Sequence, residues 1–175
     1  AQFASAYGQL TEDGQLRLTE PSCKVDALEE LAQELGDQRA IVFAESQQLI
    51  ALAATRLTRA SGVRGGPLEG LRIAQLTGAV PPAERQTNLT AFNEGRLNLL
   101  LLTLGAGGEG LSVRGASTVV FLQRSFNAVL NAQAEDRLVG IGRGEEGVPT
   151  TVVDVVTANT VESRVREVLV SKAAM

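Results

Sequence analysis

The stretch from Leu99 to Arg143 reads LLLLTLGAGGEGLSVRGASTVVFLQRSFNAVLNAQAEDRLVGIGR and contains two short apolar runs, each followed by a polar loop. The run from Leu97 to Leu102 leads into a glycine cluster, and the run from Thr118 to Leu122 precedes a polar helix. Runs of this length are typical of strands buried on both faces of a parallel sheet. The stretch therefore predicts a parallel sheet with polar loops at its carboxyl edge, where ligands bind in such folds.

The rest of the chain alternates between apolar runs and amphipathic segments. Strands are expected at 39–44, 71–76 and 150–156, and helices are expected to begin after Ser22, after Ser46 and at Pro81-Pro82. This alternation predicts an α/β domain with a mostly parallel central sheet flanked by helices. Residues 1–21 form either a small hairpin or a linker from an upstream lobe, and 22–175 form the main domain.

Composition excludes several classes of function. The 175 residues include 20 acids and 16 bases. The resulting net charge of −4 is unfavourable for a protein that binds nucleic acid by itself. There is no histidine, which rules out a serine–histidine triad, and the single cysteine, Cys23, rules out a Cys/His metal site. The lone cysteine and the lack of a signal peptide or a membrane-length apolar run favour a cytoplasmic protein without a membrane partner.

Polar clusters directly follow four of the expected strands. They are Glu45-Ser46, Thr77-Gly78, Thr103 to Gly110 and Gln123 to Asn127. Because the carboxyl ends of parallel strands lie at one edge of a sheet, these four loops are expected to build one site.

The glycine loop allows more than one interpretation. Gly105, Gly107 and Gly110 match a dinucleotide-binding fingerprint, but only seven residues separate Gly110 from the next strand, too few for the helix that this fingerprint requires. A phosphate-binding P-loop is excluded, because neither Lys24 nor Lys172 lies in a glycine-rich turn. The glycines could also simply permit a tight connection between strands.

Taken as a whole, the stretch resembles motifs V and VI of the Swi/Snf-type DNA translocases of helicase superfamily two. Ser125-Phe126-Asn127 stands where this family has Trp-Asn, and RAIVFAES at 39–46 resembles its motif IV. SCKVDALEELAQEL at 22–35 and LTGAVPPAERQTNLTAFNEG at 76–95 are similar to other family segments, so the resemblance runs from about Ser22 to Leu169. The residues that match motifs V and VI are Thr103, Ala106, Gly107, Gly108, Gly110, Leu111, Gln133, Ala134, Asp136 and Arg137.

The resemblance implies a RecA-like three-layer fold for residues 22–175, as the second, C-terminal helicase lobe. In this family two RecA-like lobes close on ATP and Mg²⁺. The first lobe carries the P-loop and the metal-binding acids, and the second contributes arginines that contact the phosphates. The expected partners are therefore an N-terminal lobe in the same full-length chain and double-stranded DNA. ATP and Mg²⁺ are expected in the full-length protein, whereas the isolated lobe is expected to be a monomer with neither bound.

The resemblance also assigns roles to individual residues. Arg137, the first arginine of motif VI, is expected to contact the γ-phosphate, unless it forms a salt bridge with Glu135 or Asp136, and Arg143 is a second catalytic candidate. Capping or turn formation is an equally good explanation for Ser46 and Thr77. The candidates for the nucleotide side are Gly108, Glu109, Gly110 and Gln133. Those for the DNA backbone are Ser46, Thr77, Gly78, Thr103 and Gly107, and no metal ligand is expected.

The chain departs from the family at the second arginine of motif VI. Where the family has His-Arg-Ile-Gly-Gln, the chain has Val139-Gly140-Ile141-Gly142-Arg143, and Gly140 has no side chain to offer. Either Arg143 substitutes for the missing arginine in an ATP-dependent double-strand DNA translocase, or the lobe is a non-hydrolysing DNA- or protein-docking module. The alanine, glycine and arginine bias suggests a bacterial or phage-encoded, nucleoid-associated protein.

Overall fold

The computed structural model describes residues 6–106, 113–141, 151–158, 160, 162 and 163, and for 135–141 it describes the backbone only. Within these residues a five-stranded sheet has the order β4-β5-β3-β6-β7, with every neighbouring pair parallel. The strands are β3 (Ala40–Ala44), β4 (Ile73–Leu76), β5 (Leu99–Thr103), β6 (Thr118–Phe121) and β7 (Thr151–Asp154). The predicted parallel sheet is confirmed, and four of the strands lie within their predicted apolar runs, whereas β5 extends one residue beyond its run, to Thr103.

The central strands explain why the sequence shows continuous apolar runs rather than alternation. Every residue of β3, β5 and β6 is buried, because helices cover both faces of the sheet. The ladder aligns Ala40 with Leu99 on one side and with Thr118 on the other. The three carboxyl ends are therefore level, and the loops that follow them begin side by side.

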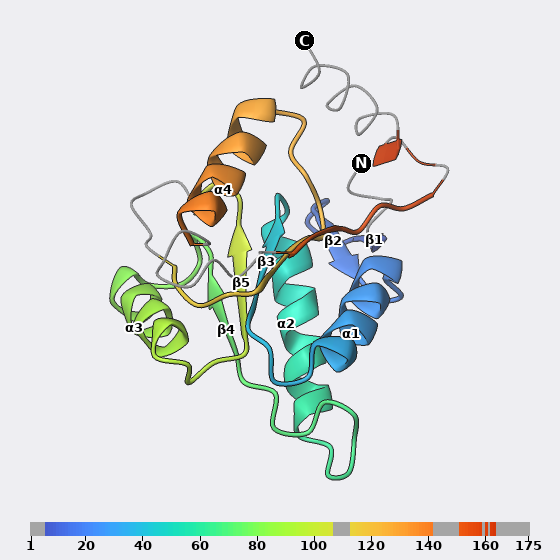
Figure 1. Cartoon of the computed structure of the whole chain (residues 1–175). Coiled ribbons are helices and arrows are strands. Elements are labelled where there is room, and N and C mark those ends of the chain that lie inside the picture. Colours follow the sequence, from blue (N-terminus) through green and yellow to red (C-terminus); the bar gives the residue numbers. More distant parts are fainter. Residues whose placement is uncertain (1–5, 107–112, 142–150, 159, 161, 164–175) are drawn as a thin grey trace.

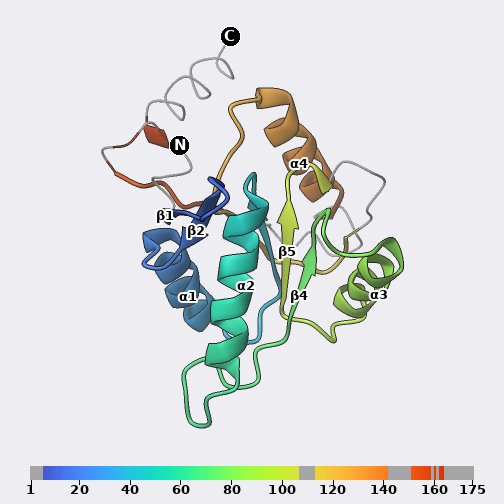
Figure 2. The same cartoon turned by 180° about the vertical axis from the view of Figure 1, so that it is seen from behind.

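Two helices pack on each face of the sheet, which gives three layers (Figures 1 and 2). One core cluster joins α1 (Cys23–Leu35) and α2 (Gln47–Ser61) to one face. The other cluster joins α3 (Pro82–Asn93) and α4 (Ala128–Ile141) to the opposite face. The predicted helix starts are confirmed, since Ser22 and Ser46 accept hydrogen bonds from the third residue after each, and a proline opens α3.

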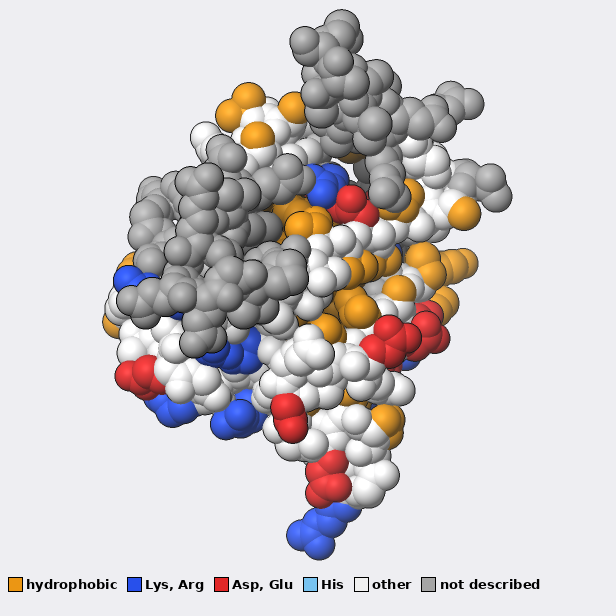
Figure 3. Space-filling view, viewed as in Figure 1, with side chains coloured by type: hydrophobic (Ala, Val, Ile, Leu, Met, Phe, Trp, Pro, Cys, Tyr) orange, Lys and Arg blue, Asp and Glu red, His pale blue; other side chains and the backbone are white. Residues whose placement is uncertain are grey.

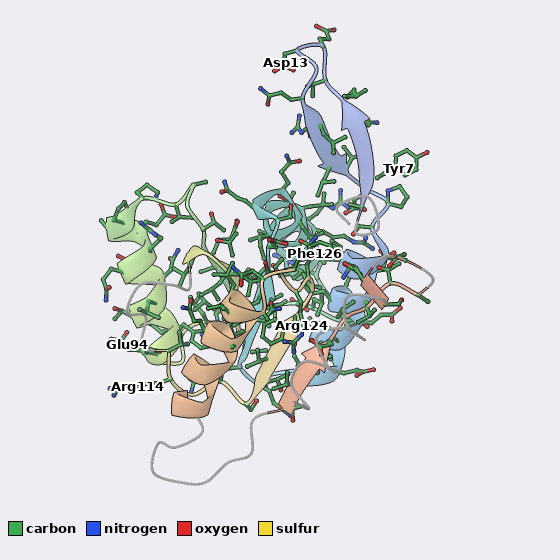
Figure 4. The ribbon with its side chains drawn as sticks, turned by 90° about the horizontal axis from the view of Figure 1, so that it is seen from above. Tyr7, Asp13, Glu94, Arg114, Arg124 and Phe126 are labelled. Atoms are coloured by element: carbon green, nitrogen blue, oxygen red, sulfur yellow. The ribbon has the colours of Figure 1, made fainter. Side chains whose placement is uncertain are left out.

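A two-stranded hairpin precedes the main domain. Strand β1 (Tyr7–Leu10) pairs antiparallel with β2 (Leu16–Thr19), and Leu18 is buried against the cluster under α2. The carboxamide of Gln48 accepts from the Leu18 amide at 2.7 Å and donates to the Leu16 carbonyl at 3.1 Å. Of the hairpin and the linker considered for residues 1–21, the described part forms the hairpin, which projects from one side of the domain (Figure 4).

None of the helices among the described residues has both the length and the apolar character that a membrane span requires.

Gly115, just before β6, is a position where the fold depends on glycine. Its φ is +75°, and a Cβ atom there would lie 1.8 Å from Nη2 of Arg39. The Arg39 guanidinium packs over the ring of Phe92 and donates to the Phe92 carbonyl at 2.9 Å. This contact ties the carboxyl end of α3 to the amino end of β3.

We expect Gly115→Ala to lower the free energy of unfolding by about 1–2 kcal/mol, the cost of a left-handed backbone for a residue with a Cβ. Displacement of Arg39 would add to this loss. Urea denaturation of Gly115→Ala, with and without Arg39→Ala, separates the two contributions. A smaller loss in the Arg39→Ala background is expected, and an unchanged stability in Gly115→Ala alone would contradict the prediction.

Candidate functional site

The four predicted polar loops do lie together at the carboxyl edge of the sheet. The Ser46 amide, after β3, donates to Oε1 of Gln123, after β6, at 3.0 Å. The Leu104 amide, after β5, donates to the Ala44 carbonyl at 3.0 Å. Gly78, after β4, lies next to Gln47, so that a Cβ at Gly78 would be 3.8 Å from Gln47 Oε1. The structure thus brings together the loops in which the DNA-backbone candidates were expected.

Ser46 and Thr77 have structural roles at this edge. The Ser46 hydroxyl accepts from the Leu49 amide at 3.2 Å and caps α2. The Thr77 carbonyl accepts from the Val80 amide at 3.1 Å in a turn, and the Thr77 side chain is buried. Ser46 thus caps a helix and Thr77 lies in a turn, and neither contact tests the expected phosphate contacts, while Gly78 is exposed beside them.

Thr103 is the last residue of β5 and is almost completely buried, opposite Ala44 in the ladder. It lies where the strand leads into the glycine loop. The loop candidates Gly107, Gly108, Glu109 and Gly110 fall outside the described residues.

The motif VI candidates lie on or beyond α4. Gln133 is exposed on this helix. Arg137 follows four residues later in the same helix, which places both residues on one helix face. The side chain of Arg137, with those of Glu135 and Asp136, lies outside the described part, and so do all atoms of Arg143. Neither the phosphate contact nor the alternative salt bridge of Arg137 is tested by the structure.

A hydrogen-bond network that the sequence did not assign holds the loop after β6 in place. The Ser125 hydroxyl donates to Glu45 Oε1 at 2.9 Å. The Asn131 carboxamide accepts from the Ser125 amide at 2.9 Å and donates to the Ser125 carbonyl at 2.8 Å. Together with the bond between Ser46 and Gln123, these contacts fix the start of α4 relative to β3. The available signal was the position of Gln123 and Ser125 directly after an apolar run.

Arg124 reinforces the same loop from the other side. Its Nε donates to Oδ1 of Asp154 at 2.6 Å, its Nη2 donates to Oδ2 at 3.2 Å, and its guanidinium stacks 4.0 Å from the centre of the Phe121 ring. Such a two-pronged pair is strongly directional. Arg124 and Phe126 both lie near the middle of the carboxyl edge as it is seen from above (Figure 4).

Lys24, which lies in no glycine-rich turn, is completely buried at this edge. Its ammonium group donates to the Leu122 carbonyl and, at 2.8 Å, to the Val155 carbonyl. It also lies 2.9 Å from the Glu162 carboxylate. Lys24 therefore joins the ends of β6 and β7 to the start of α1. A lysine is so rarely buried that no sequence signal indicated this role.

The charged side chains do not form a uniformly basic surface. On the face shown in Figure 3, basic and acidic side chains are interspersed along the lower rim. Arg56 on α2 is surrounded by Glu20, Asp26 and Glu29 at 2.6–3.3 Å. Desolvation lowers the pKa of Arg56, but the hydrogen bond to Asp26 and the charges of the three acids outweigh it and raise this pKa. Among the described residues, no three Cys, Asp or Glu side chains are grouped as a metal site would require.

The fold agrees with comparisons to known proteins. The family described as "Helicase conserved C-terminal domain" matches residues 23–143. A crystal structure of the C-terminal part of the Fun30 ATPase domain superposes with a TM-score of 0.69 at 21% identity, covering 85% of this chain and 45% of that one. This likeness confirms the predicted RecA-like fold.

Similar proteins come from plants, fungi and animals. Protein CHROMATIN REMODELING 19 of Arabidopsis thaliana is 34% identical over 61% of this chain. TATA-binding protein-associated factor mot1 of Schizosaccharomyces pombe is 30% identical over 79% of it, and DNA excision repair protein ERCC-6-like of Danio rerio is 28% identical over 92%. The chain spans only 7–14% of the length of these three relatives. Because they are eukaryotic, they contradict the bacterial or phage source expected from the residue bias.

The family match covers more than half of the chain and includes the whole stretch from Leu99 to Arg143. The resemblance inferred from motifs IV, V and VI is confirmed. The chain belongs to the helicase conserved C-terminal domain family, as the second RecA-like lobe of a Swi/Snf-type protein.

Proposed function

We propose that this lobe works in an ATP-dependent double-strand DNA translocase, where it closes against an N-terminal RecA-like lobe of the same full-length protein. The observation that carries the proposal is the convergence of the loops after β3, β4, β5 and β6 at one edge of the sheet. This edge holds Ser46, Gly78 and Thr103, and α4, which follows β6, carries Gln133 and Arg137. One edge could thereby reach both a nucleotide and a DNA backbone.

The division of the ATP site between two lobes has a physical reason. A guanidinium stabilises the negative charge that develops on the transferred phosphoryl group. If that guanidinium belongs to the second lobe, hydrolysis requires closure of the lobes, and each cycle of closure and opening can move the protein along DNA. Arg137 is the residue proposed to supply this guanidinium.

The proposal assigns the Mg²⁺ site to the N-terminal lobe. The described residues provide no cluster of three possible ligands, and the chain has no lysine in a glycine-rich turn. Under the proposal, Mg²⁺ and the P-loop contacts come from the N-terminal lobe. This lobe contributes arginines and backbone amides to the phosphates of ATP.

The test is to join the chain to its natural upstream sequence and measure ATP hydrolysis with and without double-stranded DNA. We expect DNA-stimulated hydrolysis that falls by at least tenfold in Arg143→Ala, because Gly140 has no side chain and Arg143 is the next arginine after it in the sequence. Full activity in Arg143→Ala would show that Arg143 does not replace the missing arginine. Tight binding of double-stranded DNA by the isolated lobe would contradict the proposal that this lobe works only together with an N-terminal lobe.

Gly140 favours one alternative function. A lobe that lacks the second arginine of motif VI could bind partners without supporting hydrolysis, as a DNA- or protein-docking module. The rejoined protein would then bind DNA but hydrolyse no ATP above background. The hydrolysis assay on the unmutated rejoined protein therefore separates the two functions.

A further inference from the structure

A cavity of about 190 Å³ lies at the opposite, amino-terminal edge of the sheet, away from the candidate site. The cavity is half open, and it is lined by the end of α1, by Asn98 just before β5 and by the connection between α2 and β4, which hangs below the sheet in Figure 1. Its apolar walls include Ala32, Leu68 and Leu71. This volume is below the range of drug-sized ligands, but it exceeds that of a cavity known to hold benzene. The cavity suits a single side chain.

The connection that forms one wall is well ordered by its own hydrogen bonds. The Gly70 amide donates to the Ser61 carbonyl at 3.1 Å, and the Leu71 amide donates to the Leu68 carbonyl at 3.0 Å. Leu68 is buried in the core cluster under α1 and α2. The cavity is therefore formed before any ligand arrives, which lowers the entropic cost of binding.

Asn98 lines the cavity and has a polar group that no described residue uses. Its side chain is 6% exposed and lines the cavity. Its Oδ1 accepts from both the amide and Nε of Arg72, at 3.1 and 3.3 Å, and these two donors fix the orientation of the carboxamide. The Nδ2 group then has no acceptor within the part of the chain that is described. It can donate a hydrogen bond to an occupant.

The remaining polar groups around the cavity are negative. Asp37 and Glu69 both line it, and Asp37 makes no ion pair with any described residue. Glu69 is held in place by the Gly65 amide, which donates to its Oε2 at 2.8 Å. Helix α1 ends at the cavity, with Gly36 as its C-cap and without a basic residue in its last turn. The negative end of the helix dipole therefore adds to the negative charge around the cavity. Arg72, a neighbouring cation, is engaged with Asn98 and does not line the cavity.

We propose that this cavity binds one lysine or arginine side chain of a partner polypeptide. The carboxylates of Asp37 and Glu69 and the end of α1 would hold the cation, and the apolar walls would pack on its aliphatic stem. Asn98 Nδ2 would donate to a main-chain carbonyl of the same partner residue. This pairing selects a peptide over a free polyamine, because a polyamine offers no acceptor to Asn98.

The proposal is tested by NMR on the 175-residue chain with N-acetyl-arginine methylamide and N-acetyl-lysine methylamide as probes. At least one of them is expected to shift the side-chain NH₂ signals of Asn98 and the backbone amides of Gly36 and Gly70. N-acetyl-citrulline methylamide, which has almost the shape of the arginine probe but no charge, should bind several-fold more weakly. Spermidine serves as the cation without an acceptor and should leave the Asn98 NH₂ signals in place.

Asp37→Asn is expected to weaken binding of the better probe about two- to fivefold, the range for an exposed ion pair. Glu30→Gln is the matched control, because Glu30 is an exposed acid of α1 that does not line the cavity. Thermal unfolding of both variants checks that the fold is intact. Equal binding of the citrulline probe, equal losses in both variants, or shifts confined to other residues would each overturn the proposal.

Discussion

Arg137→Ala is expected to lower the DNA-stimulated ATPase rate of the rejoined two-lobe protein by about 10³-fold or more, the usual effect of removing an arginine that stabilises phosphoryl transfer. Arg137 lies in α4 four residues after Gln133, and the loop that starts this helix is fixed to β3 by Gln123 and Ser125. Since the contact is needed most in the transition state, kcat should fall far more than KM rises.

Two further variants sharpen this prediction. Arg137→Lys keeps a positive charge but loses the planar fork of donors, so it should recover only a small part of the rate. Arg59→Ala is the control, because Arg59 is exposed in the last turn of α2, which packs on the opposite face of the sheet from α4, and it should leave the rate unchanged. If Arg137 instead forms a salt bridge with Glu135 or Asp136, Arg137→Ala would retain a rate within tenfold of the unmutated protein.

The layout of the fold could be predicted because local physical constraints determine it. Strands buried on both faces require unbroken apolar runs such as 97–102, and the caps at Ser22 and Ser46 leave a sequence signature at each helix start. Once a parallel sheet is predicted, the loops after its strands must share one edge. The rule alone predicts that the loops containing Ser46, Gly78 and Thr103 lie close together, and no individual motif is needed for this prediction.

The contacts of individual side chains at this edge could not be predicted in the same way. The bond from the Ser46 amide to Gln123 joins residues 77 positions apart, and its existence depends on the level ends of β3 and β6. Ser46 is a plausible phosphate ligand on paper, yet its hydroxyl already accepts a hydrogen bond from Leu49. A hydroxyl that accepts in a helix cap can still donate its hydrogen to a phosphate, so the two roles do not exclude one another.

Lys24→Met is expected to lower the free energy of unfolding by about 3–5 kcal/mol, the range for removing one partner of a buried ion pair. Lys24 is 1% exposed and its partner Glu162 is 13% exposed. Without the ammonium group, the Glu162 carboxylate keeps the Thr157 amide as a donor but loses its counter-charge. The carbonyls of Leu122 and Val155 lose the same donor.

Urea denaturation of Lys24→Met, Glu162→Gln and the double variant measures this coupling as a thermodynamic cycle. We expect the double variant to be more stable than Lys24→Met alone, because it no longer leaves a carboxylate without its cation. Arg17→Met, on the exposed side of the hairpin, should change stability by less than about 0.5 kcal/mol. A loss below about 1 kcal/mol in Lys24→Met would mean that Lys24 is not what secures the ends of β6 and β7. The predicted loss of about 3–5 kcal/mol in the free energy of unfolding would show that Lys24 holds α1 against the ends of β6 and β7, beside the candidate site.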